Sequence, residues 1–204
     1  MKKKFLLAIF LVALIPVISY AQEKIDAPAW KVGDRWVLGQ DTVITVSKAD
    51  ESSYTLTYTI GGRDSSLVYE KPSLNRIYYG AKDKRIKYEG RNRKLFNFPM
   101  EIGKSWQDKY VVKPASLGAQ ETTYVETFTP LGWEEITVAP GKFRAVKLEY
   151  KQEKLGQAAG QPKEGKILYW YSPDVKYIVK CQFEKSDYWD ETSDWELTAF
   201  QLKK

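Results

Sequence analysis

Alternation of apolar and polar residues is the feature that most constrains the fold of this chain. In 53–60 (SYTLTYTI) every second residue is apolar, which is the period of a half-buried β-strand. The stretch 133–150 shows a similar pattern on both sides of Ala139-Pro140-Gly141. Pro140 and Gly141 suit the two central positions of a type II turn. These segments predict antiparallel strands joined by tight turns.

Short segments of the same kind recur along the chain, separated by turn residues. No amphipathic helix of 12 or more residues follows residue 21, and no internal repeat stands out. The sequence therefore predicts an all-β protein, a single antiparallel meander of about ten strands curled into a half-barrel or open barrel, with a β-sandwich as the alternative. Besides the two regions above, the expected strands are 36–38, 41–47, 65–70, 76–79, 85–89, 109–113, 122–129, 167–171, 176–184 and 194–202.

Two segments are expected to be irregular. Pro99 and Gly103 interrupt 97–106, whose apolar side chains we expect to close one end of the core. The segment 152–166 is rich in Gly, Gln and Lys and has no periodicity. It is interpreted as a mobile hairpin tip.

The first 21 residues have the pattern of a cleaved leader. Lys2, Lys3 and Lys4 precede an apolar stretch, and Ser19-Tyr20-Ala21 offers small residues for cleavage after Ala21. A retained membrane anchor is the alternative, although Pro16 breaks an apolar core already short of the ~20 residues that a spanning helix needs. We expect residues 22–204 to form a single all-β domain, periplasmic or secreted, with no transmembrane segment after cleavage.

Charge and cysteine content narrow the function classes further. Three of the 32 Lys and Arg residues lie in the leader, so 29 remain against 26 acidic residues. A charge of about +3 is weak evidence for nucleic-acid binding, and we expect none. Cys181 is the only cysteine, so no internal disulfide can form. Its position among apolar residues of an expected strand favours a buried thiol, although a reactive one is the alternative.

No catalytic motif is found. The chain has no histidine, which removes His general bases, Ser-His and Cys-His catalysis and His-ligated metals. Glu134 and Glu135 are adjacent, so in a strand they point to opposite faces and cannot act as a glycosidase pair. We expect a non-enzymatic protein with no catalytic, cofactor-binding or metal-binding residues.

Two stretches of unusual composition carry alternative interpretations. The acidic-aromatic stretch 187–196 (DYWDETSDWE) could bind Ca²⁺ or stack a sugar on Trp189 or Trp195, and is otherwise a polar hairpin tip. The basic stretch 82–94 could contact anionic lipid or an envelope polymer, and is otherwise a solvated face that discourages edge pairing.

Aromatic residues make up 14% of the chain and include seven Trp. In a broad curved sheet they could line a cavity for a lipid-like or other apolar ligand. The candidate ligand-binding residues are Tyr54, Tyr58, Trp106 and Trp170. The same aromatics could equally fill a core, which would favour a protein–protein or anionic-polymer interaction module instead.

Three motifs together resemble a known family. They are 98–106 (FPMEIGKSW), 137–143 (TVAPGKF) and 169–175 (YWYSPDV). Their order and spacing are similar to those of TapB-like uncharacterised bacterial envelope proteins, which carry a domain of unknown function related to the LolA/LolB-like half-barrels. The resemblance covers about residues 95–183. In the turn motif Ala139 and Pro140 are exchanged relative to the family pattern.

The resemblance implies a curved antiparallel sheet in the cell envelope and gives no catalytic residues. Together with the leader and the aromatic content, it predicts an envelope protein that binds a lipid-like or other apolar ligand on a concave sheet face. An envelope protein partner is the expectation under the alternative of a filled core.

Overall fold

The computed structural model describes residues 23–71, 73–81, 84–87, 94–112, 121–155, 163–186 and 194–204. The predicted leader, most of 82–94 and residues 187–193 lie outside these ranges. Within them the secondary structure consists of β-strands without a helix. No helix in the described ranges is long and apolar enough to cross a membrane.

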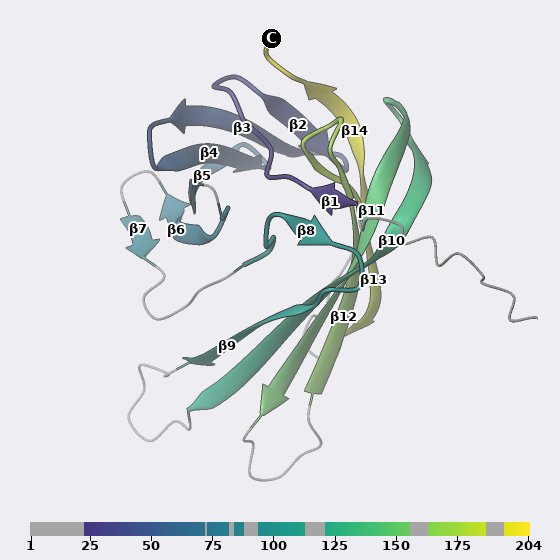
Figure 1. Ribbon diagram of the computed structural model, residues 1–204. Helices are drawn as coiled ribbons and strands as arrows, with labels where there is room; N and C mark the ends of the chain where they lie inside the picture. Colours follow the sequence, from purple (N-terminus) through teal and green to yellow (C-terminus); the bar gives the residue numbers. More distant parts are fainter. Residues whose placement is uncertain are drawn as a thin grey trace, which may run out of the picture.

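Within the described residues, twelve strands form one antiparallel sheet, in two runs that are each continuous in chain order (Figure 1). The first run contains β2 (Arg35–Leu38), β3 (Thr42–Ala49), β4 (Ser53–Ile60), β5 (Arg63–Glu70), β6 (Arg76–Ala81) and β7 (Lys84–Lys87). The second contains β9 (Trp106–Val112), β10 (Thr122–Val138), β11 (Gly141–Leu155), β12 (Lys163–Ser172), β13 (Tyr177–Ser186) and β14 (Trp195–Gln201). The order is β7-β6-β5-β4-β3-β2-β14-β13-β12-β11-β10-β9.

The last strand joins the two runs. β14 pairs with β2 on one side and with β13 on the other, where the described residues pair Lys180 with Glu196 and Cys181 with Trp195. The sheet curls about this joint, and the described parts of its edge strands β7 and β9 do not pair with each other (Figure 1). The predicted all-β open half-barrel is confirmed.

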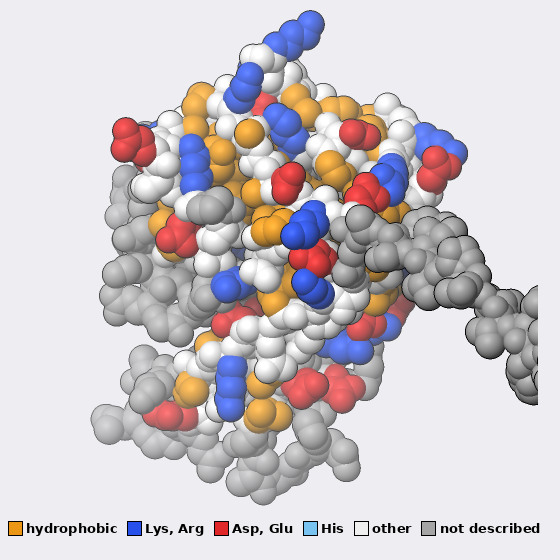
Figure 2. All heavy atoms as spheres, in the orientation of Figure 1, with side chains coloured by type: hydrophobic (Ala, Val, Ile, Leu, Met, Phe, Trp, Pro, Cys, Tyr) orange, Lys and Arg blue, Asp and Glu red, His pale blue; other side chains and the backbone are white. Residues whose placement is uncertain are grey.

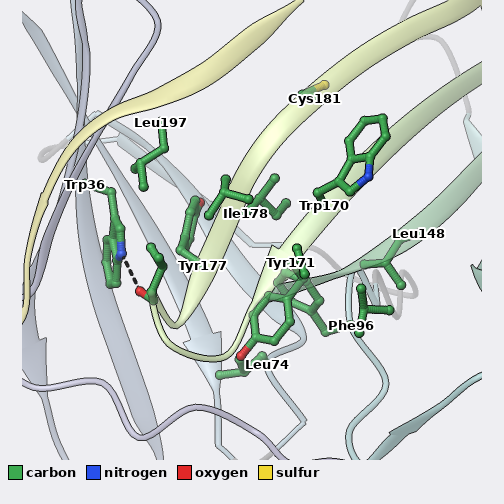
Figure 3. Packing of buried hydrophobic residues seen from close by; sticks show 14 of the residues in the cluster. Trp36, Leu74, Phe96, Leu148, Trp170, Tyr171, Tyr177, Ile178, Cys181 and Leu197 are labelled. Atoms are coloured by element: carbon green, nitrogen blue, oxygen red, sulfur yellow. Dashed lines mark hydrogen bonds between the residues drawn. The ribbon is translucent and has the colours of Figure 1, made fainter. Parts of the chain in front are cut away.

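The core lies on the inner face of the curled sheet. Trp36, Ile44, Val46 and Leu56 of the first run are fully buried, as are Val146 and Val179 of the second. Figure 3 shows Trp36 and Tyr177 side by side, with ring centroids 4.8 Å apart. Burying large aromatic rings of this kind stabilises a chain whose single cysteine cannot form an internal disulfide.

Two short strands outside the main sheet contribute residues to the core. β1 (Lys24–Ile25) pairs with β8 (Met100–Glu101) outside the main sheet. Ile25, Phe96 and Met100 are buried in the core cluster, as is Trp106, so apolar residues of 97–106 contribute to the core. The segment is not wholly irregular as predicted, because Met100–Glu101 pairs as a strand.

Three local predictions were wrong. The segment 122–138 is one strand, not two, because a bulge between Pro130 and Gly132 absorbs the break in the pattern. Val138 pairs with Gly141, so Ala139-Pro140 forms the two-residue loop, and the expected type II turn centred on Pro140 and Gly141 is not formed. Cross-strand pairs such as Gln152 with Gly165 extend β11 and β12 into the expected hairpin tip.

Candidate functional site

The structure places three of the four predicted ligand-binding residues in the core cluster. Trp106 stacks on Phe128, with ring centroids 5.6 Å apart, and its Nε1 donates to the Lys94 carbonyl at 2.8 Å. The rings of Tyr54 and Trp30 form a T-shaped pair with centroids 5.2 Å apart, and the Lys71 amine lies 4.1 Å from the Tyr54 ring centroid. These contacts show that both side chains pack against protein atoms.

Trp170 is also buried. Its Nε1 donates to Oε2 of Glu134 at 2.7 Å, and this hydrogen bond, with that from Lys147, lowers the pKa of the Glu134 carboxyl. The amines of Lys147 and Lys180 lie 5.2 and 5.6 Å from the indole centroid. Tyr54, Trp106 and Trp170 are not in the described lining of the hollows over β2–β6 or of the hollow at the β11–β12 hairpin.

Tyr58, the fourth predicted residue, differs from these three because it lines a hollow of about 400 Å³. We call this hollow the turn pocket. Its described lining comes from the β2–β3 turn, β4 and the beginning of β14. The lining residues are Leu38, Gly39, Gln40, Asp41, Thr42, Tyr58, Asp194 and Trp195.

The turn between β2 and β3 is held against β14 by hydrogen bonds. The Gly39 amide donates to the Glu196 carbonyl at 2.9 Å, and the Thr198 hydroxyl lies 3.3 Å from the Gly39 carbonyl. Gly39 has φ +59°, and a Cβ added there would lie 3.7 Å from Cβ of Trp195. Gly39 therefore has a left-handed backbone conformation that favours glycine. In this conformation the β2–β3 turn lies beside Trp195.

Tyr58 reaches the turn pocket from the neighbouring hairpin. It lies directly across from Ile44 in the β3–β4 register, two residues along β3 from Thr42. Burial raises the pKa of the Tyr58 phenol, and the nearby Tyr69 raises it further. The phenol is therefore a neutral hydroxyl at physiological pH, which can both donate and accept a hydrogen bond.

Asp194 also lines the turn pocket and directly precedes Trp195 in the chain. Its Oδ1 accepts a hydrogen bond of 2.9 Å from the Phe183 amide, which orients the carboxylate at the beginning of β14. Trp195 lies across from Cys181 in the register. Burial raises the pKa of the Cys181 thiol to about 12, and Asp194 adds to that shift. The predicted buried cysteine is confirmed, and a neutral thiol is a poor nucleophile.

A second hollow, of about 560 Å³, has a different chemistry. We call it the hydroxyl hollow. It lies over β3, β4, β5 and β6, and among its described lining residues it has no aromatic ring. The lining residues are Ser47, Lys48, Asp50, Ser52, Ser53, Thr55, Thr57, Asp64, Ser65, Ser66, Val68 and Ile77.

A buried polar cluster on β9, β10 and β11 was missed by the sequence analysis. Oε1 of the fully buried Glu126 accepts hydrogen bonds from the hydroxyls of Tyr110 and Tyr150 and from the Gln152 amide, at 3.0, 3.1 and 3.0 Å. Asp108, also buried, lies directly across from Glu126. The alternation of the strand pattern places Glu126 on the inner face. The sequence around Glu126 does not show which three groups donate hydrogen bonds to it, because they come from neighbouring strands.

The described surface also bears on the predictions for charge distribution and metal ligands. Acidic and basic side chains are interspersed over the face shown in Figure 2. Among the described residues no three His, Cys, Asp or Glu side chains gather to hold a metal ion. Glu134 contacts Lys147 whereas Glu135 contacts Lys142, in agreement with the prediction that the two carboxylates point to opposite faces.

Comparison with known proteins gives distant likenesses only. No protein-family model and no curated protein matches the chain. Among solved structures, the chain is similar to the hypothetical lipoprotein YmcC from Escherichia coli K12, at 13% identity and a TM-score of 0.46, covering 88% of this chain and 90% of that one. A provisionally designated lipoprotein from Parabacteroides distasonis is similar at 12% identity and a TM-score of 0.42, covering 88% and 100%.

A provisionally designated exported protein with a YmcC-like fold, from Bacteroides fragilis, is similar at 10% identity and a TM-score of 0.38, covering 87% of this chain and 99% of that one. At these identities and TM-scores the likeness assigns neither a family nor a function. The resemblance to TapB-like proteins stays a prediction, and the candidate site rests on its own geometry.

Proposed function

We propose that this chain is an exported, non-enzymatic protein of the bacterial cell envelope that binds a small ligand in the turn pocket. The observation that carries the proposal is the convergence of Tyr58 and Trp195 with two carboxylates around one hollow of about 400 Å³. Hollows of roughly 300–1,000 Å³ with aromatic walls and a few polar groups are typical ligand sites.

The lining of the turn pocket suits a ligand with an apolar surface. Leu38, Tyr58 and Trp195 supply carbon-rich walls, and the latter two are only partly buried. Tyr54, Trp106 and Trp170 are buried among protein atoms instead. Of the four aromatic residues predicted to bind a ligand, we therefore retain only Tyr58 in the proposed site, and we add Trp195.

The second candidate function is an interaction module with a filled core. It is favoured by the complete burial of large side chains such as Trp36 and Tyr171, because a packed interior offers no room for cargo. In this alternative the turn pocket is a surface depression, and the protein acts through partners on its surface.

Native mass spectrometry of the protein, exported to the periplasm and purified without detergent, separates the two candidates. The ligand-binding proposal predicts a discrete added mass that organic extraction removes. Trp195→Ala should lose this adduct, whereas Trp133→Ala, a matched change of another half-buried indole, should keep it. A bare wild-type mass, or an adduct that both variants keep, would favour the interaction module.

A further inference from the structure

The charge of the turn pocket distinguishes between anionic, neutral and cationic ligands. Asp41 and Asp194 are both exposed carboxylates in the lining. Among the described lining residues no Lys or Arg offsets them. An anionic ligand, such as a fatty acid, would bring a third negative charge into this hollow, and like charges at short range repel.

The two carboxylates are available to a ligand. Asp41 has no ion pair or side-chain hydrogen bond with any described residue, and Asp194 uses one oxygen to accept from the Phe183 amide. The neighbouring Glu196 is already engaged, since its Oε1 binds the Lys180 amine at 2.9 Å. The negative charge of the turn pocket therefore comes from Asp41 and Asp194.

The aromatic side chains complement this charge. Tyr58 and Trp195 lie in the same lining as the carboxylates. The negative face of an aromatic ring attracts a cation within about 6 Å of its centroid, and Trp is the strongest of the aromatic residues in this respect. Aromatic walls beside carboxylates are a common way to hold an organic ammonium group, whose methyl or methylene groups also need apolar contact.

Resting on the function proposed above, we infer that the turn pocket takes an organic cation, with an ammonium group between the Tyr58 and Trp195 rings and its charge offset by Asp41 and Asp194. The hydroxyl hollow is a poorer cation site, because Lys48 lies in its lining and no described ring faces it. A volume of about 400 Å³ admits a small quaternary ammonium or a short polyamine segment.

Choline is the test probe, titrated into the full exported chain by calorimetry. We expect saturable binding that weakens as NaCl rises, since exposed charge pairs are screened by salt. The double variant Asp41→Asn/Asp194→Asn should bind at least tenfold more weakly with the fold unchanged. Asp26→Asn removes an exposed carboxylate outside the pocket lining and should bind like the wild type.

Glucose and octanoate, titrated in parallel, separate a failure of the cation inference from a failure of the proposed function. Saturable binding of either probe, abolished by Trp195→Ala and without choline binding, would overturn the cation class and leave ligand binding in the pocket intact. Choline bound equally by the double variant would also overturn the inference. If none of the three probes binds and the wild-type mass is bare, both the inference and the proposed function fail.

Discussion

Trp36 packs against the turn that contains Val175, and its indole Nε1 donates a hydrogen bond of 2.8 Å to the Val175 carbonyl (dashed line in Figure 3). The contact joins the first strand of the main sheet to the turn between β12 and β13. Trp30 repeats the arrangement, donating to the neighbouring Lys176 carbonyl at 2.9 Å. Two indoles of the N-terminal region thus satisfy carbonyls of one C-terminal turn, which ties the two runs of strands together.

Trp36→Phe should lower the free energy of unfolding by about 1–3 kcal/mol, because it leaves a buried carbonyl without its donor, and the lost ring volume adds to this. Urea denaturation measures the change. Trp195→Phe is the control, since the Trp195 indole makes no hydrogen bond to a described residue, and it should cost less. Equal losses in the two variants would show that ring size alone matters.

Glu126 offers a test of the buried polar cluster. Glu126→Leu removes the acceptor of three hydrogen bonds, and each buried donor left without a partner costs about 1–3 kcal/mol. Glu126→Gln keeps a side-chain oxygen in place as an acceptor and replaces the other carboxyl oxygen by an amide group. We expect the Leu variant to lose clearly more stability in urea than the Gln variant. The reverse order would contradict the described role of Oε1.

Cys181 should make the fold sensitive to alkaline pH. Burial raises the pKa of its thiol to about 12, against about 8.5 in an unfolded chain. A raised folded pKa gives stability that is complete below pH 8.5 and is lost as pH rises toward 12. Between pH 8 and pH 10 this amounts to about 2 kcal/mol. Urea titrations should show a smaller decline for Cys181→Ala; equal declines would contradict burial of the thiol.

Arg144 should control the order of the N-terminal segment. Its Nη1 and Nη2 bind the two carboxylate oxygens of Glu23 at 2.8 and 2.6 Å, and its guanidinium lies 3.9 Å from the Trp133 ring centroid. Lys cannot reproduce the two-point contact. Arg144→Lys should speed amide exchange of Glu23 and β1, with little change in global unfolding because exposed pairs contribute little. Lys142→Ala is the matched control, and equal exchange in both variants would contradict this role.

Strand periodicity was sufficient to predict most of the sheet. β4 has the bounds expected from its alternation, although Ile60 at its end is exposed instead of facing the core. The run 122–138 was divided at Pro130 because a local pattern does not reveal the bulge that keeps β10 continuous. The short β8 needs its partner β1, which is far away in sequence.

Less of the candidate site could be predicted from the sequence. Tyr58 and Trp195 both drew attention as aromatic residues, but nothing local distinguishes them from the buried Trp106 and Trp170, whose indole partners come from distant segments. Asp41 was missed because it was assigned to the expected strand 41–47, whereas the structure places it in the turn before β3. Only the pairing of β14 with β2 brings these residues together.

Hydrogen exchange of the protein as isolated, compared with the same protein after organic extraction, tests ligand binding in the turn pocket most directly. The account predicts faster exchange after extraction in 39–42 and 195–197, which border the turn pocket, and no change in 53–57, which borders the hydroxyl hollow. Identical exchange before and after extraction, or a change confined to 53–57, would contradict it.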